Sequence, residues 1–120
     1  MKGLRTTIYK VPDLEAAAAW YADAFGAKPY FDEPFYKGFN IAGYELGLLP
    51  GDTAPTDKSD NVLSYWSVDD VAAEIERLMY LGAALHQEAT NVGGPITVGS
   101  VTDPWGNVIG LIDNPDFKAE

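Results

Sequence analysis

Apolar and polar residues change their period along this chain, and the changes predict strands and helices. Between residues 4 and 11 the two kinds alternate, which is typical of a strand with one buried face. Pro12 ends that strand and Asp13 can cap a helix, in which apolar residues recur on one stripe. The stripe stops at Gly26, a residue that favours the left-handed conformation at helix ends. The start of the chain therefore predicts a strand followed by an amphipathic helix.

Turn residues divide the next stretch into short strands. The predicted strands are residues 28–32, 36–42 and 44–49. Pro34 and Gly43 lie in the two gaps between them, where a change of chain direction is expected. Residues 50–61 are polar and rich in Pro, Asp and Thr, so we interpret them as a linker.

The second half of the chain repeats the first. The segment VPDLEAAAAWYADAFGA at residues 11–27 is echoed by VDDVAAEIERLMYLGAA at residues 68–84. A strand at 62–68 precedes a helix that Asp69 or Asp70 caps and Gly82 ends. Further strands follow at residues 84–88, 96–102 and 108–112, with a loop at 91–95 and a type I turn at 103–106. Such a repeat predicts an internal duplication, with a ligand cleft available where the halves meet.

These elements predict an α+β fold of two βαβββ modules in tandem. Each helix covers one face of its own strands, and the free faces form a curved mixed sheet around a cleft. A length of 120 residues suits a single domain, 1–120. Within it we place the first module at about 3–50, the linker at 51–61 and the second module at about 62–115.

Composition narrows the classes of partner. The net charge of −10 would repel a phosphate backbone, so nucleic acid and anionic membranes are disfavoured and a cationic ligand is favoured. No apolar run is long enough for a membrane span, and the N-terminus does not resemble a signal peptide. The chain has no cysteine, which permits a reducing compartment, and we expect a cytoplasmic protein.

Few residues offer catalytic chemistry. His86 is the only imidazole, and it is either a general base near pH 7 or a half-exposed structural residue. No nucleophile elbow and no phosphate-binding glycine loop is present. Residues 30–39 instead contain five aromatic side chains and two acidic ones, a combination that binds flat cations. Most aromatics in a small β-rich protein belong to the core, so both interpretations stay open.

The order of the elements and their motifs resemble a known family. V-P-D-L opens the first helix at residues 11–14, F-G-A and L-G-A close the two helices, and D-P-W-G-N at 103–107 precedes the last strand. This combination is similar to the vicinal oxygen chelate superfamily, which includes glyoxalase I, bleomycin-resistance proteins, fosfomycin-resistance enzymes and extradiol dioxygenases. The resemblance covers nearly the whole chain.

The resemblance also implies where a divalent metal would bind. Enzymes of the superfamily hold one ion on the cleft floor, with His and Glu ligands from the first and last strands of each module. The matching positions here are Thr6, Gly47, Leu63 and Gly110, of which only threonine carries even a poor donor. Glu45 lies on the same strand face as Gly47 and could ligate only after a shift of register. We therefore expect no metal and no other cofactor.

Small and apolar residues at those positions would leave a roomy cleft floor, suited to an organic molecule. Strand alternation and the aromatic segment then give the candidate ligand-binding residues. They are Thr6, Tyr36, Phe39, Glu45, Leu63, Tyr65, Trp105 and Gly110. Trp105 lies at a turn and could form either a lip of the cleft or a dimer contact.

The favoured hypothesis is a metal-free protein that sequesters an aromatic or cationic organic molecule. By resemblance to the bleomycin-resistance group it would be a homodimer without catalytic activity. A first alternative is a metal-dependent lyase or isomerase similar to glyoxalase I, or a dioxygenase, in which Glu45 and His86 are recruited for catalysis. A second alternative is a structural or regulatory subunit whose cleft has no ligand.

Overall fold

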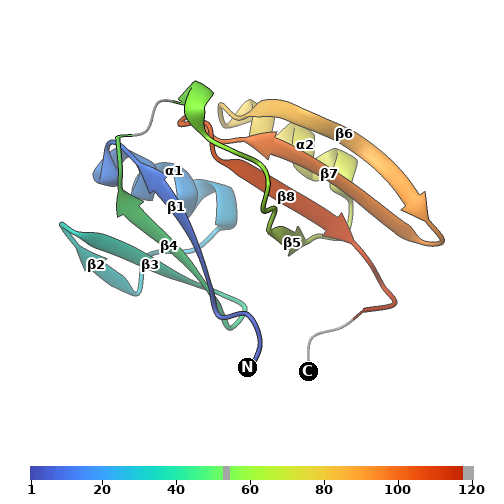
Figure 1. Ribbon diagram of the computed structural model, residues 1–120, viewed down its shortest axis with the longest axis horizontal. Coiled ribbons are helices and arrows are strands. Elements are labelled where there is room, and N and C mark those ends of the chain that lie inside the picture. The colour runs from blue at the N-terminus through green and yellow to red at the C-terminus, as the bar shows by residue number, and fades with distance from the viewer. Residues whose placement is uncertain (53–54, 118–120) are drawn as a thin grey trace. The chain divides into compact units, whose positions relative to one another are not determined.

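A computed structural model describes residues 1–52 and 55–117, and in it the order of elements is βαβββ twice (Figure 1). The chain divides into two compact units, Met1–Asp57 and Lys58–Glu120, with a boundary inside the predicted linker. None of the helices in the described ranges is long and apolar enough to cross a membrane. The α+β fold of tandem βαβββ modules is confirmed, with one four-stranded mixed sheet in each unit.

The first unit builds its sheet in the order β1-β4-β3-β2. Its elements are β1 (Thr6–Val11), α1 (Leu14–Phe25), β2 (Phe31–Glu33), β3 (Tyr36–Ile41), β4 (Tyr44–Pro50) and a short 3₁₀ helix, η1 (Pro55–Asp57). β1 runs parallel to β4 and the other pairs are antiparallel. A parallel pair needs a crossover, which here consists of α1 and the β2–β3 hairpin.

The second unit repeats this topology in the order β5-β8-β7-β6. Its elements are β5 (Tyr65–Ser67), α2 (Val71–Tyr80), β6 (Ala84–Gly93), β7 (Ile96–Thr102) and β8 (Val108–Asp113). β5 is parallel to β8, as β1 is to β4. The duplication read from the sequence is thus a duplication of strand order and strand direction.

The helix ends follow the capping residues. Asp13 Oδ1 accepts the Ala16 backbone N–H at 3.1 Å, and Asp70 Oδ1 accepts that of Ala73 at 3.0 Å. Of the two acidic residues expected at the second helix, Asp70 is therefore the cap. Each such cap stabilises its helix by about 1 kcal/mol. Gly26 ends α1 with φ 64, a conformation that glycine adopts without strain.

Each helix covers one face of its own sheet, as Figure 1 shows. In the first unit the Tyr21 ring stacks on Tyr9 with centroids 5.5 Å apart and is fully buried. Lys37 on β3 points to the same side, is only 2% exposed, and pairs with Glu15 of α1 at 2.8 Å and with Asp32. The opposite, helix-free face of each sheet is the one on which candidate site residues lie.

Phe39 differs from its expected place. It is fully buried and pairs in register with Leu46, another fully buried residue. Strand alternation places Lys37 and Phe39 on the helix side of β3, and Tyr36 and Gly38 on the helix-free side. Phe39 therefore belongs to the core of the first unit and not to a ligand surface.

Two local predictions also differ. β6 continues to Gly93, so the expected loop at 91–95 is reduced to a turn around Gly94. β5 begins only at Tyr65, which leaves Leu63 half-buried in the segment before the strand. Residues 53–54 of the predicted linker lie outside the described ranges.

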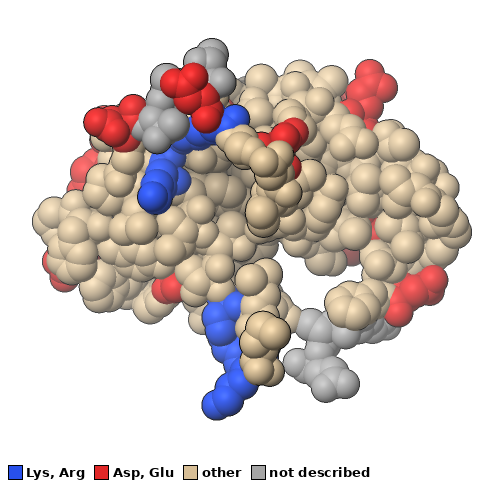
Figure 2. All heavy atoms as spheres, viewed as in Figure 1, with Lys and Arg blue, Asp and Glu red and all other residues tan. Residues whose placement is uncertain are grey.

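Acidic side chains lie at several separate places on the face seen in Figure 2, while the basic ones gather at two. The charge of −10 is therefore not concentrated in one patch on this face. A local environment for a cation has to come from particular carboxylates, and one such group lies on the sheet of the first unit.

Candidate functional site

Three hydroxyl groups converge on the carboxylate of Glu45, on the helix-free face of the first sheet. Thr6 Oγ1 donates to Oε1 at 2.9 Å, Tyr30 donates its hydroxyl to Oε2, and Tyr36 donates a third hydrogen bond. The register of the parallel pair places Thr6 directly opposite Glu45. The sheet itself therefore assembles one side of this cluster, and the tyrosines add the other.

The hydrogen bonds keep Glu45 ionised. The pKa of Glu45 is lowered, chiefly by the Tyr30 hydroxyl and further by Thr6 and Tyr36, against an opposing effect of burial. Burial and the bond to Glu45 raise the pKa of Tyr36 to about 12. The bond to Glu45 also raises the pKa of Tyr30. At neutral pH the cluster is thus one negative charge held by neutral donors.

Two glycines let the tyrosine rings lie on the sheet. Gly38 and Gly47 are partners in register. A Cβ at Gly47 would lie 2.8 Å from Cζ of Tyr36, and a Cβ at Gly38 would lie 3.2 Å from ring carbons of both Tyr30 and Tyr36. No side chain fits at Gly47 while Tyr36 keeps this position. The Tyr36 ring consequently fills the space that a residue at position 47 would need.

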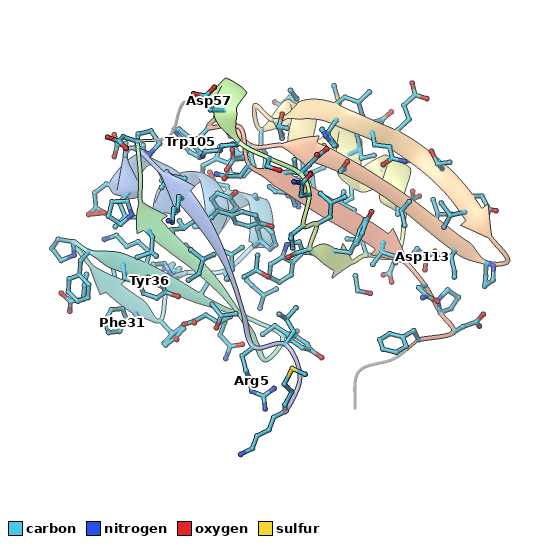
Figure 3. The ribbon with its side chains drawn as sticks, in the orientation of Figure 1. Arg5, Phe31, Tyr36, Asp57, Trp105 and Asp113 are labelled. Carbon is cyan, nitrogen blue, oxygen red and sulfur yellow. The ribbon has the colours of Figure 1, made fainter. Side chains whose placement is uncertain are left out.

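Further aromatic rings lie beside the cluster on the β2–β3 hairpin. Phe31 contacts Phe35 and Tyr36, with centroids 6.0 Å apart in both pairs. Phe35 is 62% exposed and Tyr30 is 64% exposed, so these rings are open to solvent. In Figure 3 the labelled side chains of Phe31 and Tyr36 lie at the same end of the first unit. The site therefore combines an ionised carboxylate with exposed aromatic faces.

The second unit also places a tyrosine ring against a glycine of its last strand, but from a different strand and without a carboxylate. Tyr65 pairs in register with Gly110, and a Cβ at Gly110 would lie 2.8 Å from Cδ1 of the Tyr65 ring. The same Cβ would lie 2.5 Å from the backbone oxygen of Ser64. The residue at the place of Glu45 is Val108, which offers no charge. Tyr65 lies on β5, the counterpart of β1, whereas Tyr36 lies on β3, so the two tyrosine–glycine contacts arise from different strands of the repeat.

His86 is engaged elsewhere. Its Nδ1 lies 2.7 Å from Ser100 Oγ and its Nε2 lies 3.3 Å from Asp60 Oδ2, all within the second unit. Ser100 is only 2% exposed, so its hydroxyl is not presented to a substrate. The partners of His86 and those of Glu45 are different residues.

Trp105 lies in the turn before β8. Its backbone N–H donates to Asp103 Oδ1 at 2.9 Å, and the same oxygen accepts the N–H of Asn107 at 2.7 Å. Asp103 is buried and organises this turn. The structure thus gives a structural account of the D-P-W-G-N motif and leaves the role of Trp105 toward a ligand as a prediction.

The structure brings together three of the candidate residues, Thr6, Tyr36 and Glu45. It adds Tyr30, which belongs to the aromatic segment of residues 30–39 but was not among the candidate ligand-binding residues. Tyr30 precedes β2, and its backbone N–H donates to the Gly38 oxygen at 2.9 Å, which extends the hairpin by one bond. The sequence feature that could have indicated Tyr30 is Gly38, a glycine that lies across the hairpin from this aromatic residue.

The repeated strand order and direction define a duplicated α+β protein of tandem βαβββ modules. The chain belongs to the Glyoxalase/Bleomycin resistance protein/Dioxygenase superfamily, whose family model matches residues 3–111. This confirms the resemblance seen in the motifs. A search of curated proteins finds no match.

Several solved structures share the fold. A glyoxalase-related enzyme from Fulvimarina pelagi is 24% identical with a TM-score of 0.75, and the match covers 96% of this chain and 90% of that one. The fosfomycin resistance protein FosX from Listeria monocytogenes is 21% identical with a TM-score of 0.79, covering 97% and 96%. A glyoxalase/bleomycin resistance protein/dioxygenase family enzyme from Burkholderia phytofirmans PsJN is 17% identical with a TM-score of 0.74, covering 90% and 95%. At these identities the likeness carries the fold alone.

A structure of the Listeria protein is described as a complex with Mn(II). In this chain the positions that the resemblance assigns to metal ligands are Thr6, Gly47, Leu63 and Gly110. Glycine and leucine have no donor atom in their side chains, and a neutral hydroxyl is a weak ligand for a divalent ion. At Gly47 the Tyr36 ring also takes the space of a longer side chain. These residues do not fit the metal of the family's enzymes.

Proposed function

We propose that this protein binds a small organic cation with an aromatic body on the helix-free face of the first unit, without catalysing a reaction. The observation that carries the proposal is the ionised Glu45 carboxylate, held by Thr6, Tyr30 and Tyr36 beside exposed aromatic rings. A carboxylate attracts the positive group, while the rings provide faces for stacking.

The energies of these contacts support useful affinity. A cation over an aromatic face gains about 0.5–2 kcal/mol, depending on how far it is desolvated. Stacking of an aromatic ligand on Phe31 or Phe35 adds about 0.5–1.5 kcal/mol for each ring pair. The charge of −10 raises the local concentration of cations around the protein. A neutral ligand of the same shape would keep the stacking but lack the cation–π attraction and the raised local concentration.

Several features favour binding over catalysis. A general base works best when its pKa lies near the pH of the reaction, and the lowered pKa of Glu45 moves this carboxylate away from that range. Tyr36, with a pKa of about 12, is a poor proton donor at neutral pH for the same reason. The assigned ligand positions, moreover, do not suit a metal. The lyase alternative, which needs Glu45 as base or ligand, is therefore the weaker one.

By resemblance we extend the proposal to a cytoplasmic homodimer. Light scattering coupled to size-exclusion chromatography would measure the mass of the particle, and a monomer at micromolar concentration would contradict the dimer. Oligomeric state and ligand binding are separate parts of the proposal, so either can fail alone.

The first test is a titration of planar aromatic cations and their neutral isosteres, followed by calorimetry. We expect the cations to bind and the isosteres to bind at least about 10-fold more weakly, as expected when a hydrogen bond to a charged group is lost. Glu45→Gln should abolish this preference. Glu88→Gln is the matched control, because Glu88 is an exposed residue of β6 in the second unit. Equal binding of cations and isosteres would refute the proposal.

The metal-free part has its own test. The protein is incubated with excess Mn(II), Ni(II), Zn(II) and Fe(II), desalted, and submitted to elemental analysis. We expect no ion to be retained in stoichiometric amount. Retention of any one ion would contradict the donor argument and restore the metal-dependent alternative. Failure of every organic cation to bind would instead favour the structural or regulatory subunit.

A further inference from the structure

The three donors to Glu45 differ in how they are held. Tyr36 lies over Gly38 and Gly47, is half-buried, and is the first residue of β3, an inner strand of the sheet. Thr6 is a half-buried residue of β1 opposite Glu45. Tyr30 is 64% exposed and lies before β2, one of the two edge strands of the sheet, so it differs from Thr6 and Tyr36 in its exposure. Tyr30 is therefore the outermost of the three donors.

The two oxygens of Glu45 are also not equivalent. Oε1 accepts from Thr6, inside the sheet register, whereas Oε2 accepts from Tyr30. A carboxylate has about four acceptor positions, so three hydroxyl donors leave little unused capacity. A donor arriving from solvent meets the Tyr30 hydroxyl before it meets the other two. The simplest way for a ligand to bind the Glu45 carboxylate is to replace the hydrogen bond from the Tyr30 hydroxyl.

We propose that the ligand is an alkylamine with an aromatic body, protonated on its nitrogen, and that its N–H takes the place of the Tyr30 hydroxyl on Oε2 of Glu45. This inference rests on the proposed function and specifies its ligand class. The exchange replaces a neutral donor by a charged one, and charge-assisted hydrogen bonds are roughly twice as strong. The Tyr30 ring stays beside the ligand as an aromatic wall.

This arrangement distinguishes two kinds of cation. A protonated tertiary amine has one N–H and can form the new bond. A quaternary ammonium on the same aromatic skeleton has the same charge but no N–H. It therefore cannot replace the hydrogen bond that Glu45 loses when the Tyr30 hydroxyl is displaced. A site that acted only through cation–π attraction would accept both, because that attraction needs no N–H.

The first experiment measures dissociation constants by calorimetry at pH 7.5 for such a pair of ligands, an amine and its N-methylated quaternary analogue. We expect the amine to bind about 10-fold or more tightly, the difference that a hydrogen bond to a charged group provides. Equal binding, or tighter binding of the quaternary ion, would overturn the inference and leave the proposed function intact. Binding of neither would refute the proposed function itself.

The second experiment uses Tyr30→Phe, which keeps the ring and removes the hydroxyl. The amine then has no bond to displace, so its affinity should rise about 2- to 10-fold, the range for one neutral hydrogen bond. Tyr44→Phe is the control and should change nothing, since Tyr44 is another exposed tyrosine, on β4, whose hydroxyl is not among the donors to Glu45. Circular dichroism verifies the fold of both variants. Weaker or unchanged amine binding in the Tyr30→Phe protein would contradict displacement.

Discussion

The two units of this chain share a topology but differ in chemistry at corresponding places. In both, a tyrosine ring lies over the glycine of the last strand, Tyr36 over Gly47 and Tyr65 over Gly110. Beside that glycine the first unit has Glu45 and the second has Val108. The two tyrosines come from strands that do not correspond, β3 in the first unit and β5 in the second, so each contact depends on its own side chain. The charge depends on a single side chain and appears once, which argues that a ligand is recognised by the first unit.

The largest difference that can be tested lies in the two cores. Phe39 on β3 and Val101 on β7 occupy the same place in their sheets, and both are fully buried. Phe39→Ala should lower the free energy of unfolding by about 3–5 kcal/mol, because it removes a large side chain and leaves a cavity. Val101→Ala should cost less, since fewer atoms are lost. Urea unfolding followed by circular dichroism measures both, and a Phe39→Ala protein as stable as the wild type would contradict the core assignment.

The glycines give a sharper comparison. At Gly110 a new Cβ would meet the backbone oxygen of Ser64 at 2.5 Å, whereas at Gly47 its three nearest neighbours would all be atoms of the Tyr36 side chain. Gly110→Ala should therefore destabilise the protein by about 1–3 kcal/mol, the usual cost of overpacking.

Gly47→Ala should destabilise the protein less, because the Tyr36 ring can swing away. It should, however, weaken cation binding, since the Tyr36 ring then leaves the face on which the ligand is proposed to bind. Thermal unfolding and calorimetric titration of the two variants separate these effects. Equal loss of stability in both, with unchanged binding in Gly47→Ala, would show that the two contacts are equivalent after all.

The smallest expected effect is a pH dependence in the first unit. The folded-state pKa of Glu45 is lowered, so its contribution to stability is present above the pKa of the unfolded chain and is lost as pH falls through the folded value. Below about pH 4.3, the ordinary value for glutamate, the wild type should lose more stability than Glu45→Gln. Urea midpoints at pH 7 and pH 3 test this. A wild type and variant that lose the same stability would contradict the hydrogen-bonded carboxylate.

Most of the fold could be predicted because its signals are local. Asp13 and Gly26 mark the ends of α1 by capping chemistry that operates within a few residues, and the repeat predicts the second unit from the first. Phe39 was misplaced because the aromatic segment of residues 30–39 contributes rings to both faces of β3. Only the register of the strand separates Tyr36 from Phe39, and register depends on pairing with a strand several residues away.

The cluster on Glu45 was only partly predictable for the same reason. Thr6 and Glu45 follow from strand alternation, since both were expected on one face. Tyr30 lies outside the regular strand, and its reach to Glu45 depends on the absence of a side chain at Gly38. Alternation does not describe residues before a strand begins.

The ring of Tyr36 over Gly47 has a consequence for substitution at position 47. A single mutation that placed glutamate or histidine at position 47 would meet the ring before it could meet an ion. A larger residue at position 47 requires the Tyr36 ring to move off the sheet or to be replaced, and either change gives up its hydrogen bond to Glu45. A metal ligand at position 47 and a complete set of donors on Glu45 therefore exclude each other in this packing.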